Sequence, residues 1–290
     1  MLRQKMLPTP TAIAAGSTST FNLDLGLRYH AIWLELGDSV GIAGGDLRTV
    51  LAAAVDQIRL KVNGKVQRTM TAAELYDINS LMGAAFAASS SGTRTQAGYR
   101  MYLPIWLAEP WRKNNAEVPL TAWNAQGISS LQLEVDLHAG LTAPVLTGWF
   151  EYDNATGNLG AITKWIRQTF AAAGTQMDIN TIDKRDYLNS IHFYPESSNT
   201  RFVNKLRLTA NGAEIRGLMT ALENQAMLLG RELVPDQSAT PRFDLVLDYD
   251  DPINNALNCN GLAELTVHVE FDAAAAGGMV AIIQRTGAPE

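Results

Sequence analysis

The phrase Ile-Arg-Leu-Lys-Val-Asn-Gly at 58–64 returns as Leu-Arg-Leu-Thr-Ala-Asn-Gly at 206–212. Four more pairs of similar segments follow the same order along both halves of the chain. They are 14–29 with 172–187, 71–83 with 220–230, 100–110 with 242–252, and 131–137 with 265–271. The separation between partners shrinks towards the C-terminus, which indicates shorter loops in the second copy. Because five segments keep their order, the chain is predicted to contain an internal duplication.

Each copy carries runs in which apolar and polar residues alternate. The apolar residues of these runs include Phe21, Leu23 and Leu25, Ile58, Leu60 and Val62, and Leu131, Leu133, Val135 and Leu137 in the first copy, and Phe243, Leu245 and Leu247, and Leu265, Val267, Val269 and Phe271 in the second. Such alternation is typical of antiparallel strands with one face in a core. Asn63-Gly64 and Asn211-Gly212 separate such runs. Since Asn and Gly tolerate positive φ, each pair predicts a tight hairpin turn.

One short helix is expected inside each copy. Thr71 with Glu74, and Thr220 with Glu223, have the Thr-x-x-Glu spacing of a capping box, and Gly83 and Gly230 offer stops. We expect both helices to pack on the sheets, since short helices are marginal alone. The faces predicted to pack are those that carry Leu75, Ile78 and Met82 in the first helix and Leu222, Ala226 and Leu229 in the second.

These elements predict an all-β fold, namely two tandem eight-stranded antiparallel jelly rolls with short inserted helices. The N-terminal jelly roll is expected over 1–158 and the C-terminal one over 175–290. A connecting helix is expected over 159–174, because apolar residues fall near one helical face there. The segment 37–55 has no counterpart in the second copy.

Composition narrows the function classes. The chain has 290 residues, 47% of them hydrophobic, a net charge of −6 and one cysteine, Cys259. An acidic chain with scattered cations is a poor general phosphate binder, so sequence-specific nucleic acid is not expected as a partner. One cysteine excludes an intrachain disulfide. No signal peptide or bilayer-spanning segment is expected, which is consistent with synthesis and folding in a cytoplasm.

The chain resembles the double jelly-roll major capsid proteins of tailless icosahedral phages with an internal membrane, in particular the corticovirus type. The resemblance spans roughly 7–285 and rests on the first strands at 7–36, the segment 163–194 and the hairpin with its helix at 203–230. It implies a homotrimeric, pseudo-hexagonal capsomer that tiles an icosahedral shell around a membrane. It further implies a virion protein made in the host cytoplasm, with lateral contacts to copies of itself and to other capsid proteins such as a vertex penton.

Acidic residues suggest one metal hypothesis. Asp248, Asp250 and Asp251 lie close together at a predicted strand end, and hard carboxylate oxygens suit a structural Ca²⁺. No other cofactor and no catalytic residue is predicted. The four histidines are far apart in sequence, and no nucleophile motif occurs.

Two surface hypotheses follow from the remaining residues. Trp106, Trp111 and Trp123 surround a Pro-rich loop and are predicted to make subunit contacts, because Trp often anchors interfaces. Arg3 and Lys5 precede the first acidic residue and are predicted to face the anionic surface of the viral membrane, with a disordered terminus as the alternative.

The sequence therefore favours a structural major capsid protein and not an enzyme. Two alternatives stay open. One is a two-jelly-roll glycan hydrolase, which requires paired carboxylates such as Glu109 and Asp251 to converge. The other is a carbohydrate- or receptor-binding minor capsid or spike protein, which requires an exposed aromatic platform.

Overall fold

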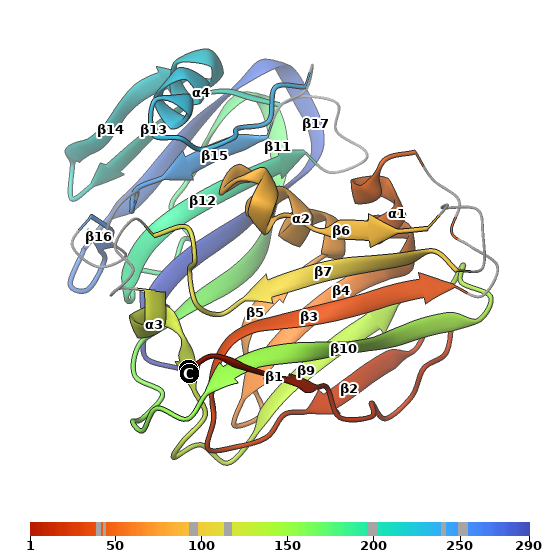
Figure 1. Ribbon diagram of the computed structural model, residues 1–290. Coiled ribbons are helices and arrows are strands. Elements are labelled where there is room, and N and C mark those ends of the chain that lie inside the picture. The colour runs from red at the N-terminus through yellow and green to blue at the C-terminus, as the bar shows by residue number, and fades with distance from the viewer. Residues whose placement is uncertain are drawn as a thin grey trace. The chain divides into compact units, whose positions relative to one another are not determined.

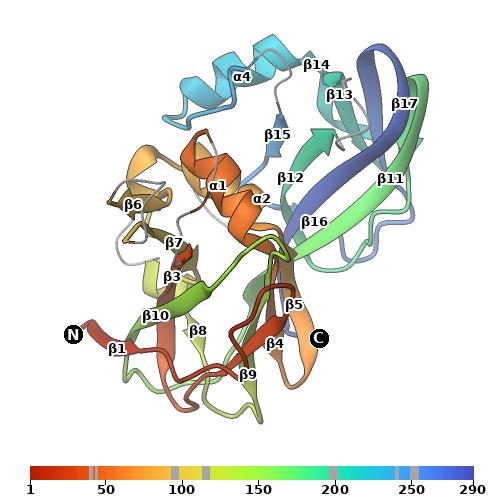
Figure 2. The same cartoon turned by 90° about the vertical axis from the view of Figure 1, so that its right-hand side faces the viewer.

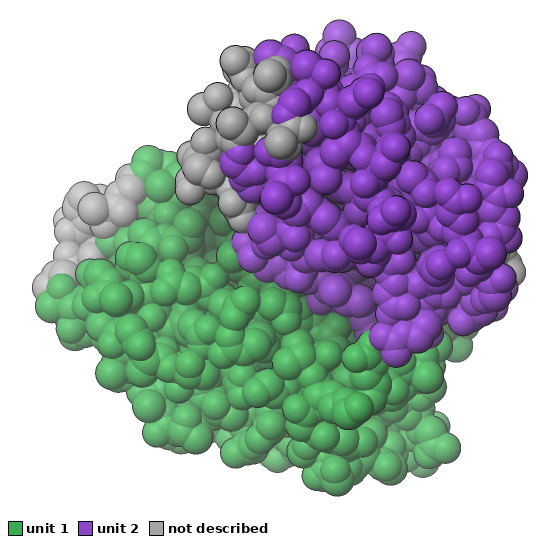
Figure 3. Space-filling model, turned by 180° about the vertical axis from the view of Figure 1, so that it is seen from behind, with its two compact units in different colours: residues 1–163, 288–290 green, residues 164–287 purple. Residues whose placement is uncertain are grey.

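The computed structural model describes residues 1–38, 42, 45–92, 98–112, 118–195, 202–238, 242–248 and 255–290. The chain divides into two compact units, which Figure 3 shows in different colours. Unit 1 comprises Met1–Thr163 with Ala288–Glu290, and unit 2 comprises Lys164–Gly287.

Unit 1 is a β-sandwich with short helices. Its elements are β1 (Arg3–Met6), β2 (Thr18–Asn22), β3 (Arg28–Asp38), α1 (Leu47–Ala54), β4 (Val55–Val62), β5 (Lys65–Met70), α2 (Ala72–Leu81), the 3₁₀ turn η1 (Ala84–Phe86), β6 (Ser89–Ser91), β7 (Arg100–Trp106), α3 (Val118–Thr121), β8 (Trp123–Asn124), β9 (Leu131–Leu137) and β10 (Pro144–Asp153). One sheet has the order β1-β10-β3-β7-β6, with β8 beside β3. The other has the order β5-β4-β9-β2, and the strands pair antiparallel (Figure 1).

Unit 2 repeats this plan and contains two especially long strands, its first and its last. Its elements are β11 (Ile162–Ile179, whose first two residues belong to unit 1), β12 (Tyr187–Pro195), β13 (Val203–Ala210), β14 (Ala213–Thr220), α4 (Ala221–Leu229), β15 (Phe243–Val246), β16 (Leu257–Asn258) and β17 (Leu265–Gly287). One layer has the order β14-β13-β17-β11, and in the other β12 pairs with β15, β16 and β17. The first part of β17 pairs with β13 and its last part with β12, so this one strand spans both layers.

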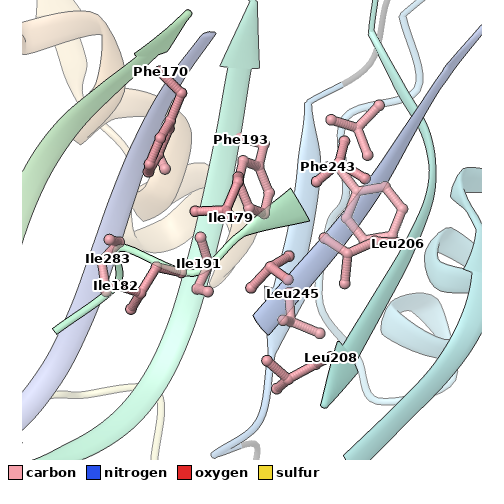
Figure 4. Close-up of a cluster of buried hydrophobic side chains, with 14 of the residues drawn as sticks. Phe170, Ile179, Ile182, Ile191, Phe193, Leu206, Leu208, Phe243, Leu245 and Ile283 are labelled. Atoms are coloured by element: carbon pink, nitrogen blue, oxygen red, sulfur yellow. The ribbon is translucent and has the colours of Figure 1, made fainter. Parts of the chain in front are cut away.

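The duplication is confirmed element by element. Strands β3, β4, β5 and β7 of unit 1 correspond in order to β12, β13, β14 and β15 of unit 2, and α2 corresponds to α4. The separate strands β9 and β10 correspond to the two parts of β17. The alternating apolar residues face the interior as predicted, except Leu25, which lies in the turn before β3 and is 46% exposed. Figure 4 shows part of the resulting core of unit 2, with Phe193, Leu206, Phe243 and Leu245 among its members.

Both Asn-Gly hairpins form, and each asparagine has a second role that the turn signal did not reveal. Asn63 has φ of 51° and Asn211 has φ of 49°. The Asn63 Oδ1 accepts hydrogen bonds from the backbone N–H groups of 129–130 at 2.7 and 3.3 Å. The Asn211 Oδ1 accepts the same pair from 263–264 at 2.9 and 3.0 Å. Each asparagine therefore holds its hairpin to the start of the neighbouring strand, β9 or β17.

The capping boxes are confirmed at both helices. The Thr220 hydroxyl accepts from the Glu223 N–H at 3.2 Å, and the Glu223 carboxylate accepts from the Thr220 N–H at 2.8 Å. Thr71 and Glu74 repeat the arrangement at 3.1 and 2.8 Å. This reciprocal bonding satisfies N–H groups that the first helical turn leaves unpaired.

The predicted packing face of α4 is wrong. The buried residues of α4 are Ala221, Asn224 and Leu228, whereas Leu222, Ala226 and Leu229 are exposed. In α2, by contrast, Leu75 and Ile78 are buried as expected. The predicted residues do share one face of the helix. The Asn224 side chain, however, points to the sheet and donates to the Asp244 carbonyl at 2.9 Å, so the apolar face points outward.

The predicted connecting helix at 159–174 is also wrong, because β11 covers Ile162–Ile179 as a strand beside β17. The positions of Ile162, Trp165, Ile166 and Phe170 match a helical face, which misled the prediction. The segment is rich in β-branched and aromatic residues, which suit a strand, and hydrogen bonding to β17 decides between the two forms.

Replacing Asn211 with Ala is expected to lower the free energy of unfolding by about 1–3 kcal/mol, because Ala is strained at positive φ and leaves two N–H groups unpaired. Asn211→Gly also removes the two hydrogen bonds, but Gly tolerates positive φ. The decrease in free energy of unfolding should therefore be smaller for Asn211→Gly than for Asn211→Ala. Urea unfolding of the three proteins measures both effects. An Ala variant as stable as the parent protein would contradict the assigned role.

Candidate functional site

A row of aromatic rings crosses the outward face of the β10-β3-β7 sheet in unit 1. In spatial order its members are Trp111, Phe86, Trp106, Trp33, Trp149 and Tyr102. Trp33 stacks on Trp149 with ring centroids 5.7 Å apart, and it meets Trp106 edge-on at 5.4 Å. The tryptophans of the row are partly exposed. Partly exposed aromatic rings on a sheet face mark a surface suited to a binding partner.

The row contains two of the three tryptophans predicted to make subunit contacts. Trp106 and Trp111 are partly exposed and lie on either side of Phe86, so their role as contacts stays a prediction. Trp123 is fully buried, with the Arg68 guanidinium 5.0 Å from its ring centroid, so it cannot touch another chain. The prediction for Trp123 is wrong because β8 places this side chain inside the unit.

Arg68 and Glu109 belong to one buried polar cluster. Arg68 donates to the carbonyls of Thr163 at 2.8 Å and Trp106 at 2.6 Å. Burial lowers the pKa of Arg68 to about 9, against the opposing influence of the Glu109 carboxylate. Glu109 itself accepts from Arg112 at 2.7 Å and from the Thr163 hydroxyl at 3.1 Å. A buried carboxylate held in this way is a structural group.

The hydrolase alternative needed Glu109 to act with Asp251. Glu109 is engaged with Arg112 and Thr163, as described above, and is 6% exposed. Asp251 lies outside the described residues. The arrangement of Glu109 therefore offers no support for glycoside cleavage, which needs a carboxylate that reaches substrate.

Unit 2 contains a chain of side chains with the hydrogen-bonding order of a serine hydrolase site. The Ser190 hydroxyl lies 2.9 Å from His192 Nε2, and His192 Nδ1 lies 2.7 Å from the Asp244 carboxylate. Ser190, however, donates to Gln284 at 2.8 Å, and Arg242 also binds Asp244, at 2.5 Å. Ser190, His192 and Asp244 are each no more than 1% exposed, so no substrate reaches the hydroxyl. The cluster joins β12 to β15 and β17. Sequence spacing could not reveal it, because its members come from separate strands.

Of the three aspartates in the metal hypothesis, the structure describes Asp248. Asp248 accepts a hydrogen bond from the Asn189 amide at 3.0 Å, whereas Asp250 and Asp251 lie outside the described residues. Within the part of the chain that the structure describes, no group of three His, Cys, Asp or Glu side chains could hold a metal ion. A Ca²⁺ site at these three aspartates stays a prediction.

The two basic residues near the N-terminus lie on a strand. Arg3 and Lys5 are exposed on β1, which pairs with β10. Lys5 contacts Asp24 at 2.5 Å, and the hydrogen bond to this carboxylate raises the pKa of Lys5. The alternative of a disordered terminus is wrong for residues 3–6, while contact with a membrane stays a prediction.

An ion pair ties the long central strand of unit 1 to its neighbour. Arg28 on β3 binds Asp153 on β10 through Nη2 at 2.6 Å, and His30 Nε2 lies 2.8 Å from the same carboxylate. Burial alone would raise the pKa of Asp153. Hydrogen bonds from Arg28, from the Ala155 N–H and from His30 outweigh burial and place this pKa well below its usual value.

Comparison with known proteins identifies the family. The model of the viral coat protein P2 N-terminal domain matches residues 4–153, and that of the viral coat protein P2 C-terminal domain matches residues 162–284. The chain belongs to the viral coat protein P2 family. The two P2 domain matches fall one on each half of the duplication. A comparison with curated protein sequences finds no match.

Solved structures agree with the P2 assignment. The major capsid protein P2 of bacteriophage PM2 superposes with a TM-score of 0.80 at 13% identity, covering 99% of this chain and 97% of that one. The Faustovirus major capsid protein gives 0.70 at 8% identity, covering 99% and 90%. The STIV MCP gives 0.68 at 12% identity, covering 99% and 96%. The fold of this P2 protein is therefore the double jelly roll.

Membership of the P2 family makes this chain a structural coat protein and a virion component, and not an enzyme. Among the described residues, no helix has both the length and the hydropathy needed to cross a bilayer.

Replacing Asp153 with Asn is expected to lower the free energy of unfolding of this P2 protein at pH 7, by on the order of 2 kcal/mol. A depressed carboxyl pKa stabilises the fold fully above the unfolded value of about 3.9, and this stabilisation is lost as pH falls towards the folded pKa. The difference in free energy of unfolding between parent and variant should therefore decrease below about pH 4. Guanidinium unfolding at pH 7, 4 and 3 measures this difference.

Asp178→Asn is the matched control, since Asp178 also contacts a histidine but its side chain is 64% exposed. It should change stability little at any of these pH values. A gap for Asp153→Asn that stays constant with pH would contradict the role given to its ionised form.

Proposed function

We propose that this P2 coat protein is the major capsid subunit of its virion and assembles as a homotrimer. One observation carries the proposal: each chain holds two β-sandwiches with the same order of elements. Three such chains supply six similar sandwiches, and six similar bodies in a closed ring have the outline of a hexagon. Hexagonal tiles pack side by side over the faces of an icosahedral shell.

Partly exposed apolar surface supports self-assembly. The aromatic row of unit 1 leaves several tryptophan rings in contact with water, and apolar patches on a monomer are suited to protein contacts. Copies of the chain are the most abundant partners available to a coat protein. The proposal extends to lateral contacts between trimers and with other capsid proteins, such as one at the vertices.

A shell that encloses a membrane is the second part of the proposal. Arg3 is the cation on β1 that would meet anionic headgroups, because Lys5 is paired with Asp24. The membrane contact rests mainly on the resemblance to phages of this kind. Sedimentation of purified trimer with vesicles that contain phosphatidylserine would test it.

A minor, receptor-binding coat protein is the competing function, because the aromatic row could stack against sugars. The number of copies per particle separates the two. A major capsid protein should be the most intense band when purified particles are resolved on a denaturing gel, whereas a spike or receptor-binding protein should be a faint one.

Size-exclusion chromatography with light scattering should give about three times the chain mass of 31.5 kDa. Obligate interfaces bury more than roughly 2,000 Å², so the trimer should persist on dilution. A stable monomer at micromolar concentration would remove the trimer from the proposal but would leave the family assignment intact.

A further inference from the structure

The outward face of α4, formed by Leu222, Ala226 and Leu229, is apolar and exposed. The three residues lie at i, i+4 and i+7, so they form one stripe along the helix. Leu222 is 77% exposed and Leu229 is 49% exposed. A stripe with this spacing normally packs against a core, and here it faces solvent.

The corresponding helix of unit 1 is covered by an element of its own chain. Helix α1 packs against α2, and both views of unit 1 show the two helices side by side (Figure 2). Arg48 of α1 donates to the Asp77 carboxylate of α2 through Nε, at 2.8 and 2.9 Å, and through Nη2, at 2.8 Å. Asp77 occupies the position that Ala226 has in α4, as the shared capping boxes establish.

Unit 2 lacks such a cover among its described residues. The segment that forms α1 has no counterpart in the second copy, and the face exposed in its place is apolar where α2 has a polar one. The apolar face of α4 is therefore exposed at the position where α1 packs on α2 in unit 1. This difference indicates that another molecule packs on α4.

One charge on the helix itself favours a particular kind of partner. Glu223 directly follows Leu222 in α4. Within the described ranges the Glu223 carboxylate has no cationic partner, and hydrogen bonds from Thr220 lower the pKa of Glu223. A fitting partner therefore combines apolar side chains with positive charge.

The N-terminal strand of the chain has this combination. All four residues of β1 are exposed, and it is the outermost strand of its sheet. Leu2 is 52% exposed and Met6 is 60% exposed, and Arg3 between them has no acidic partner in the described residues. Other outermost strands of unit 1 lack such apolar groups: β6 consists of serines, and β2 carries polar side chains at its exposed positions.

We propose that the segment Met1–Met6 of one copy docks on the outward α4 face of a neighbouring copy. Leu2 and Met6, which share one face of the segment, cover Leu222 and Leu229, and the long side chain of Arg3 reaches the Glu223 carboxylate around the free edge of the strand. Each chain carries both surfaces, so the contact is head-to-tail and can close into a ring. This contact rests on the proposed homotrimer and names one of its interfaces.

The test is a disulfide between chains. Met6→Cys with Leu222→Cys in one chain places a thiol on each surface, while the native Cys259 is buried. After mild oxidation, a non-reducing gel should show covalent dimers and trimers, and neither single variant should cross-link. Leu120→Cys with Leu222→Cys is the matched control, since Leu120 is 75% exposed on unit 1 but outside the contact, and it should stay uncross-linked.

A second measurement does not depend on cysteine chemistry. Leu222→Lys should raise the concentration at which the trimer dissociates by about tenfold or more, because it removes a buried Leu from the contact. Arg3→Glu should weaken the trimer, because it places two carboxylates together, whereas Arg3→Lys should leave it largely unchanged.

The outcomes separate the contact from the trimer. A parent protein that is trimeric but whose double-cysteine variant does not cross-link overturns the contact and leaves the trimer standing. A monomeric parent removes both. Covalent dimers from Leu222→Cys alone would show that two α4 faces meet each other. If Arg3→Glu abolishes binding to phosphatidylserine vesicles and leaves the trimer unchanged, the N-terminal strand faces lipid instead.

Discussion

The main strands of this coat protein each have an apolar face that must be kept from water, and a single sheet cannot do this alone. Two sheets packed face to face bury both apolar faces, which is why each copy of the repeat folds as a sandwich. Strand β17 shows how strong the constraint is, because its first part pairs with β13 and its last part with β12. One continuous strand thereby joins both layers of unit 2.

Polar groups inside the sandwiches add specificity to this apolar packing. Arg68 and Glu109 in unit 1, and His192 and Asp244 in unit 2, are buried with hydrogen-bonding partners. Removing one member would leave another buried and unpaired, which costs more than the bond itself contributes. Such clusters resemble catalytic sites in composition, but they are buried from solvent. Their role is therefore structural: they hold neighbouring strands together by hydrogen bonds. The residues open to partners lie elsewhere, on the aromatic row and on α4.

The two units share a fold but differ on their outward surfaces. Helix α2 is covered by α1 and held by the Arg48–Asp77 pair, whereas the equivalent face of α4 is apolar and open. Duplication conserves what the core requires and leaves the outward faces free to diverge. In the proposed homotrimer, this divergence allows unit 1 of one chain to complement unit 2 of the next.

The sequence by itself determined the duplication, because five similar segments recur in the same order. It also determined both Asn-Gly hairpins and both capping boxes, since each of these depends on residues only a few positions apart. It also carried the family likeness. Only the tertiary structure decided that Ile162–Ile179 is a strand, that Trp123 is buried while Trp106 is not, and that Leu222 and Leu229 face outward. The same holds for the grouping of Ser190, His192 and Asp244. The burial of a side chain and the pairing of a strand depend on residues that are distant along the chain. The local spacing of apolar and polar residues does not reveal which distant residues those are.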